Sequence, residues 1–211
     1  MITLHHFAHS SASYRVRIIL GLKGIEVRYR VVDMPGGEQR GAAYAALNPQ
    51  KMLPCLELED GTVIAQSLAI IQYLDTLHPE PRILPEDPAE KALFMAQVLM
   101  IACETAPLQA KLIQRYLADP CDVAPDKVEA WVEHWIRRGL SAVEGFVAAR
   151  TADGGYASGD APGLLEAVIV PQMRNCERFG IDVSDLTALT RLHALCRQHP
   201  GFSAAHPDRW L

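Results

Sequence analysis

Residues 2–32 read "ITLHHFAHSSASYRVRIILGLKGIEVRYRVV", and the alternation within them sets the expected fold class. The opening "ITLHHF" has the pattern of a short strand, and "SYRVRIILGLKG" has the apolar spacing of a helix. Gly24 ends that helical run at a position that favours a left-handed cap. Since "EVRYRVV" again reads as a strand, the stretch predicts a β-α-β unit.

The chain that follows extends this unit to a small α/β domain over residues 1–78. A polar, Gly-rich passage at 33–44 leads to the segments "CLELE" and "TVIA", which flank the turn Asp60-Gly61 and predict a hairpin. "QSLAIIQYLDTLHP" then has near-helical apolar spacing and stops before Pro79. The order β, α, β, irregular connection, β, β, α predicts a thioredoxin-like fold.

The second half of the chain has a different character. Residues 79–88, "PEPRILPEDP", hold four prolines in ten positions, which suits a linker between domains. The segments after it have apolar residues three or four apart, and they are 89–117, 126–150, 163–179 and 185–200. We therefore expect an all-helical domain over residues 89–211.

Composition excludes several classes of protein. The chain has 211 residues, 49% of them hydrophobic, and a formal charge of −5, which argues against nucleic-acid binding. No apolar run reaches the length of a membrane span, and the start has no signal-peptide pattern, so we expect a cytoplasmic protein. The five cysteines are scattered without a C-x-x-C pair, which predicts reduced thiols and no metal site.

Two serines stand just before the first predicted helix. Ser10 or Ser11 can cap this helix, or the same geometry can hold an anion or a thiolate at the positive helix end. Ser67, after Gln66, has the same two possible roles at the next predicted helix. Without a C-x-x-C pair, any sulfur handled at the first site has to arrive with a ligand.

Four motifs together carry a family resemblance. They are "SSASYRVRIILGLKGI" at 10–25, "LNPQKMLPCLELEDGTVIAQSLAIIQYL" at 47–74, "ILPEDP" at 83–88 and "VPQMRNCERFGIDVSDL" at 170–186. Over essentially its whole length the chain resembles the zeta-class glutathione transferases, which include the maleylacetoacetate and maleylpyruvate isomerases. The resemblance implies glutathione transferase architecture, glutathione as cofactor, a maleyl-type substrate and a homodimer.

The resemblance also implies roles for residues of the first domain. Ser10, and with it Ser11, would donate to the glutathione sulfur and raise its thiolate fraction. Leu53, before a cis Pro54, would pair its backbone with the cysteinyl part of glutathione as an added strand does. Gln66 and Ser67 would receive the γ-glutamyl carboxylate at a helix start.

Substrate binding is implied for His9 and Arg178, and an arginine fork is well suited to grip a carboxylate. The chain departs from the family pattern at His9, where an arginine is common, and at Ala12, where a cysteine or threonine is common. Ala12 leaves no nearby protein thiol for the reductive dehalogenation that a branch of the class performs through a mixed disulfide, so we do not expect that activity. Ala106 replaces a polar side chain that binds glutathione in many relatives, and Gln109 is a candidate substitute for it.

A further departure lies in the helical half. Gly163 and Glu166 stand where relatives carry a Ser/Thr-x-x-Asp capping box, which predicts a weakened helix start.

The activity implied is cis–trans isomerisation of a maleyl compound to its fumaryl isomer by reversible addition of the glutathione thiolate. Two alternatives stay open at this point. One is a zeta-like transferase that conjugates other electrophiles, and the other is a non-catalytic glutathione-binding protein. A thioether product would indicate the first, and glutathione binding without turnover would indicate the second.

Overall fold

The computed structural model describes residues 1–210, which divide into two compact units. The first unit contains residues 1–83 together with the chain from Arg197 onward, and the second contains residues 84–196. The boundaries expected from sequence, 1–78, 79–88 and 89–211, stay a prediction. The compact units differ from them by placing the last short helices with the first unit.

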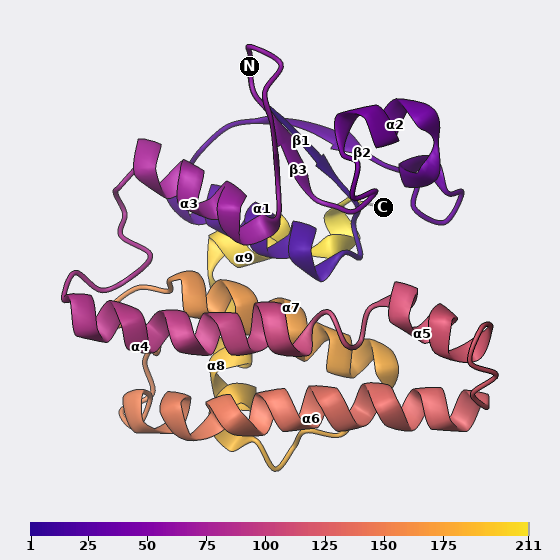
Figure 1. Cartoon of the computed structure of the whole chain (residues 1–211). Coiled ribbons are helices and arrows are strands. Elements are labelled where there is room, and N and C mark those ends of the chain that lie inside the picture. Colours follow the sequence, from indigo (N-terminus) through magenta and orange to yellow (C-terminus); the bar gives the residue numbers. More distant parts are fainter. Residues whose placement is uncertain (211) are drawn as a thin grey trace. The chain divides into compact units, whose positions relative to one another are not determined.

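A four-stranded mixed sheet forms the centre of the first unit (Figure 1). Its strands are β1 (Thr3–His6), β2 (Arg28–Val31), β3 (Cys55–Glu57) and β4 (Val63–Ala65). The spatial order is β2-β1-β3-β4, with β1 parallel to β2 and the other neighbours antiparallel. This topology confirms the thioredoxin-like fold and the predicted hairpin.

The helices of the first unit are α1 (Ser11–Lys23), α2 (Ala42–Leu47), α3 (Ser67–Leu77) and α9 (Pro200–Ala205), with 3-10 turns at η1 (Glu38–Arg40) and η3 (Pro207–Arg209). Gly24 caps α1 in the left-handed region at φ 63°, as the sequence predicts. The passage 33–44, expected to be irregular, contains η1 and the start of α2. Every residue of α1 from Ser13 to Leu20 is buried, so this part of the helix has no solvent face.

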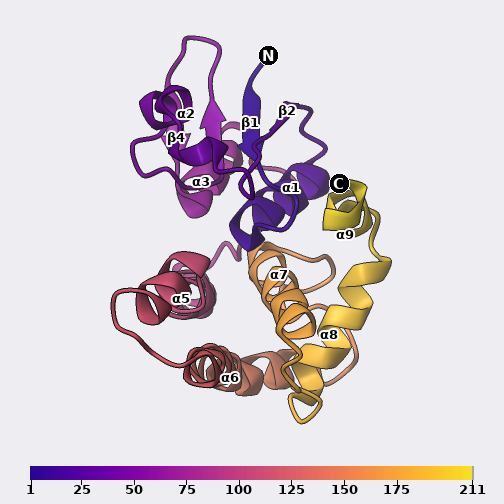
Figure 2. The ribbon, with the colours of Figure 1, turned by 90° about the vertical axis from the view of Figure 1, so that its right-hand side faces the viewer.

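α9 lies beside α1 in both ribbon views (Figures 1 and 2). The two backbones meet at Gly21 and Gly201. A Cβ placed on Gly21 would lie 2.9 Å from the carbonyl oxygen of Gly201, and one on Gly201 would lie 3.2 Å from backbone of Gly21. Since backbone atoms cannot rotate away as a side chain can, glycine at both positions allows the C-terminal helix to pack with the first unit.

Helices make up the second unit. They are α4 (Pro88–Leu99), the π-helical turn η2 (Met100–Thr105), α5 (Lys111–Ala118), α6 (Pro125–Arg150), α7 (Leu164–Phe179) and α8 (Thr187–Gln198). The predicted helical stretch 89–117 is interrupted between η2 and α5, where Pro107 lacks the N–H that a continuous helix needs. The all-helical character expected for this half is confirmed.

Carboxylates accept hydrogen bonds from backbone N–H groups at the starts of two of these helices. Glu166 accepts from the backbone N–H of Gly163 at 2.8 Å, and it also accepts from the N–H and hydroxyl of Ser158. The capping box therefore keeps its carboxylate half, although Gly163 has no side chain to complete it. Glu144 of α6 accepts from the N–H groups of Ala188 and Leu189 at the start of α8.

Candidate active site

Strand register brings three separate segments to one edge of the sheet. His5 of β1 lies opposite Cys55 of β3, and Cys55 lies opposite Ala65 of β4. The chain leaving β1, the chain entering β3 and the chain leaving β4 therefore meet at this edge. Those segments carry the predicted site residues of the first unit, which are His9, Ser10, Ser11, Leu53, Pro54, Gln66 and Ser67.

Ser10 is the N-cap of α1. Its backbone is extended, and its Oγ accepts from the backbone N–H of Ser13 at 3.2 Å. A serine hydroxyl both accepts and donates, so its O–H proton remains able to donate to a ligand. Ser11 is the first residue of the helix, and its hydroxyl makes no hydrogen bond within residues 1–210. Both hydroxyls stand at the positive end of a 13-residue helix.

The second helix start at this edge is held in an unusual conformation. Gln66 has φ 71° and ψ 119°, a region that costs a non-glycine residue about 1–3 kcal/mol. Its side-chain amide donates to Gln50 at 3.0 Å. The next residue, Ser67, begins α3 and is buried, and its Oγ accepts from Arg15 at 3.3 Å. α1 and α3 are thereby linked where both helices begin.

The peptide bond between Leu53 and Pro54 is cis, as the resemblance implies. Within the described residues, the backbone N–H and C=O of Leu53 make no hydrogen bond, so both are available to an extended ligand. The carbonyl just before Leu53, that of Met52, accepts from the Tyr44 hydroxyl and from the Asn48 amide, each at 2.8 Å. The sequence does contain Asn48 in "LNP", but nothing in its pattern connects Tyr44 to this loop.

Arg17 holds the loop between β1 and α1. Its guanidinium is only 1% exposed, and it donates to the carbonyl oxygens of Phe7 and Ala8 at 3.3 and 3.0 Å. The same side chain donates to Nδ1 of His6 and to the carbonyl of Ala205 in α9. Sequence reasoning missed this role, because an arginine in a helix ordinarily faces solvent.

His9 lies in the same loop, half-buried, with its ring edge-on to that of Phe7 at 5.7 Å.

None of the buried cysteines offers a thiolate. Burial raises the pKa of Cys55 above its usual value, raises that of Cys176 to about 12, and raises that of Cys196 further. All five cysteines are free, with Cys103 and Cys121 exposed. His5 and His6 point in different directions, and residues 1–210 hold no group of three potential metal ligands. A sulfur nucleophile at Ser10 would therefore come with a ligand.

The remaining predicted residue, Arg178, belongs to α7 of the second unit. Although the residue is exposed, desolvation of its guanidinium and next the charge of Arg174 lower its pKa from the usual arginine value. Gln109 is 4% exposed and exchanges amide hydrogen bonds with Gln172, and it also accepts from Asn175. Its amide is thus bonded within the helical interior, and its role as a substitute for a polar side chain at Ala106 stays a prediction.

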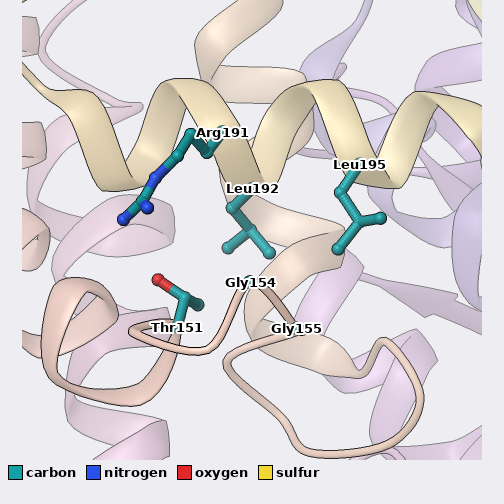
Figure 3. Close-up of a pocket in the computed structure, with 6 residues that line it drawn as sticks. All are labelled: Thr151, Gly154, Gly155, Arg191, Leu192 and Leu195. Atoms are coloured by element: carbon teal, nitrogen blue, oxygen red, sulfur yellow. The ribbon is translucent and has the colours of Figure 1, made fainter.

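A small hollow lies elsewhere in the second unit (Figure 3). Arg191, Leu192 and Leu195 project from α8 toward the loop that carries Thr151, Gly154 and Gly155. Its volume of about 20 Å³ has room for about one water molecule. It shares no residue with the predicted site, and its volume is too small for an organic substrate.

In the described chain, no helix combines the length and the apolar character that a membrane crossing requires.

Known proteins resemble this chain over nearly its full length. Residues 9–77 match the N-terminal domain of glutathione S-transferases. Maleylacetoacetate isomerase of Pseudomonas aeruginosa is 36% identical over 210 residues, which cover 97% of this chain and 95% of that protein. The holo structure of a maleylpyruvate isomerase, a bacterial zeta-class glutathione S-transferase, superimposes with a TM-score of 0.92 at 32% identity, covering 97% and 96% of the two chains.

A third relative, the maleylacetoacetate isomerase of Anaeromyxobacter dehalogenans, has been solved with two ligand sets. With glutathione in the active site it gives a TM-score of 0.86 at 38% identity, with 99% and 96% coverage. With dicarboxyethyl glutathione and citrate in the active site, it gives a TM-score of 0.85 at 36% identity, covering 99% of this chain and 92% of that chain. Identity and coverage of this extent show that the chain belongs to the zeta-class glutathione transferases, the family of the maleylacetoacetate isomerases.

Proposed function

We propose that this protein is a glutathione-dependent cis–trans isomerase of maleyl compounds. The observation that carries the proposal is the position of Ser10, whose hydroxyl caps α1 and keeps a proton to donate at the positive helix end. Relatives of the same length bear the names maleylacetoacetate and maleylpyruvate isomerase, and one holds glutathione in its active site. Maleylacetoacetate and maleylpyruvate are therefore the proposed substrates.

The residues at the sheet edge fit glutathione. The unpaired backbone of Leu53 suits the cysteinyl part, and the start of α3 at Gln66 and Ser67 suits the γ-glutamyl carboxylate. When bound, glutathione would supply a thiolate that adds reversibly to the cis double bond, so that rotation and elimination give the trans isomer. Ser10 and Ser11 would stabilise the anionic sulfur by donating to it, which increases the fraction ionised at neutral pH.

On the substrate side, we assign carboxylate binding to Arg178 and a contact role to His9. The guanidinium of Arg178 can hold a carboxylate with two parallel hydrogen bonds, which would fix the orientation of the double bond. Such orientation and the stabilisation of charge on the conjugated carbonyl are the contributions that the reaction needs from the protein.

Replacing Ser10 tests the proposal directly. Ser10→Gly is expected to lower kcat/KM for maleylacetone by about 10- to 100-fold, because the donor to the sulfur is lost while glycine still serves as a helix cap. The pKa of the bound glutathione thiol, measured from the thiolate absorbance as the complex is titrated, should move toward the value of about 8.5 of a free thiol. The assay uses glutathione well below the substrate concentration, so that turnover requires its regeneration.

Two further variants, Ser10→Ala and Ser11→Ala, distinguish the loss of the helix cap of α1 from the loss of a hydroxyl that donates to the sulfur. Ser10→Ala should also lose about 1 kcal/mol of stability, which Ser10→Gly largely retains. Ser11→Ala should change the pKa of the bound glutathione thiol less than the Ser10 variants do. A wild-type protein that consumes glutathione stoichiometrically and forms a thioether would show a transferase instead, and binding of glutathione without turnover would show a non-catalytic protein.

Tyr44 provides a second test, at the Leu53 loop. Tyr44→Phe removes one of the two donors to the Met52 carbonyl, so we expect KM for glutathione to rise several-fold with kcat little changed. The matched control is Tyr73→Phe on α3, whose hydroxyl makes no hydrogen bond within the described chain. Equal KM values for the two variants would contradict a positioning role for Tyr44.

We further propose a cytoplasmic homodimer. Five free cysteines suit a reducing compartment. Leu93 and Leu99 on α4 are 48% and 43% exposed, which leaves apolar surface for a second copy. Light scattering coupled to size exclusion would measure the mass in solution.

A further inference from the structure

α7 carries two arginines one helical turn apart. Arg174 and Arg178 are four residues apart on this helix, so they lie on the same face with Cβ atoms about 5–6 Å from each other. Arg174 is half-buried and Arg178 is exposed. The two guanidiniums can therefore reach into one common volume from a single rigid element.

The neighbouring turn of α7 is fixed by buried amides. Gln172 and Asn175 both bond to Gln109, and all three side chains are more than nine-tenths buried. Asn175 precedes Arg178 by three residues and follows Arg174 by one. This anchoring restricts rotation of α7 and so keeps the two arginines facing the same way.

Like charges at this spacing are unfavourable by themselves, by about 0.2–0.5 kcal/mol in an isolated helix. Desolvation, and next the charge of Arg174, lower the pKa of Arg178, as expected for two cations one helical turn apart. The planar fork of each guanidinium matches the two oxygens of a carboxylate, so two arginines at this spacing suit a ligand that carries two carboxylates.

We propose that Arg174 is a second carboxylate-binding residue, which selects substrates with two carboxylates by binding the one that Arg178 does not hold. The inference rests on the proposed function and extends it to substrate class. One relative holds dicarboxyethyl glutathione, an adduct whose name specifies two carboxyl groups. In this chain a maleyl diacid would present one carboxylate to each arginine of the α7 pair.

The test compares two substrates that differ in carboxylate number. Maleylpyruvate carries two carboxylates and maleylacetone carries one. Arg174→Ala is expected to lower kcat/KM for maleylpyruvate by about 10- to 100-fold, mainly through KM, and for maleylacetone by less than about 3-fold. Arg174→Lys, which keeps the charge without the fork, should recover part of the loss.

Arg191→Ala is the matched control, because Arg191 is an exposed helical arginine of the same unit outside the proposed site. Arg191→Ala should leave kcat/KM unchanged for both substrates. Equal losses for the two substrates in Arg174→Ala, or no loss for either, would overturn the inference while leaving the isomerase proposal standing.

A binding measurement keeps the inference testable if the wild-type protein turns over neither substrate. Calorimetric titration of the glutathione-loaded protein would compare maleate, a cis diacid, with isocrotonate, its monoacid analogue. Arg174→Ala should weaken maleate binding by about 10-fold or more and leave isocrotonate binding unchanged. Equal weakening of both acids, or of neither, would again reject the role of Arg174, whereas failure of wild-type turnover alone would reject only the isomerase.

Discussion

Replacing Arg17 with methionine is expected to lower the free energy of unfolding by about 3–5 kcal/mol. Methionine fills much of the same space but donates no hydrogen bond. The buried carbonyl oxygens of Ala8 and Ala205 would each lose their donor, and that of Phe7 would keep only the backbone N–H of Ser10. Buried carbonyls left unsatisfied cost about 1–3 kcal/mol each. Urea denaturation followed by circular dichroism would measure the change.

Arg17→Met should also lower the activity of the enzyme. Phe7 and Ala8 lie in the loop that leads to Ser10, so freeing their carbonyls loosens the position of the donor hydroxyl. We therefore expect kcat/KM to fall under conditions where Arg17→Met is still fully folded. Arg28→Met, at an exposed position on β2, is the control and should change stability by less than about 0.5 kcal/mol. Similar stabilities for the two variants would show that the buried guanidinium is not needed.

Local sequence signals were sufficient for most elements of the first unit. Gly24, the Asp60-Gly61 turn and the stop before Pro79 each act on the backbone of their own neighbourhood, so they can be interpreted without tertiary information. The thioredoxin-like order followed from these signals. The break at Pro107 was equally local, but the apolar spacing on both sides of it concealed the interruption.

Packing between distant segments could not be predicted in the same way. Residues 197–210 were expected with the helical half, yet α9 packs on α1 through Gly21 and Gly201. Nothing in either local sequence shows that these glycines meet, because their contact spans most of the chain. The two arginines of "YRVRI" pose a similar problem, since a long cationic side chain within an apolar run is usually solvent-facing.

The residues of the predicted site also fall into two groups, those with a local sequence signal and those without one. Ser10, Leu53 and Ser67 have local signatures, because a cap, an X-Pro bond and a helix start are visible in the sequence. Of their supporting residues, Arg15 bonds to Ser67, 52 positions along the chain, and Tyr44 bonds to the Met52 carbonyl across the loop between α2 and β3. Such contacts depend on strand register and helix packing, which no single-sequence pattern specifies.

The second large effect concerns pH and the histidine bonded to Arg17. Burial, then the charge of Arg17, then His5 lower the pKa of His6 from 6.5 to about 4. The ring is 0% exposed and packs edge-on against Trp210 at 5.0 Å. Between these two pKa values the unfolded chain binds a proton that the folded protein does not. Stability is therefore fully present above pH 6.5 and falls as the pH drops toward 4.

The size of this loss follows from linkage. Lowering the pH from 7.5 to 5 should cost the folded state about 2 kcal/mol through His6 alone, and reaching pH 4 should cost about 3 kcal/mol. Because carboxylates also titrate in this range, the quantity to measure is the difference in slope between wild type and His6→Asn. Asparagine can accept from Arg17 as Nδ1 does, and it cannot be protonated in this range.

His6→Asn should therefore show a shallower fall in unfolding free energy from pH 7.5 to 5 than the wild type, whatever its absolute stability. His78→Asn, at an exposed position after α3, is the control and should retain the wild-type slope, since solvent reaches that ring before and after unfolding. If His6→Asn and the wild type lost stability in parallel, His6 would have to accept a proton in the folded state. The guanidinium of Arg17 against its Nδ1 and its burial among aromatic rings oppose that outcome.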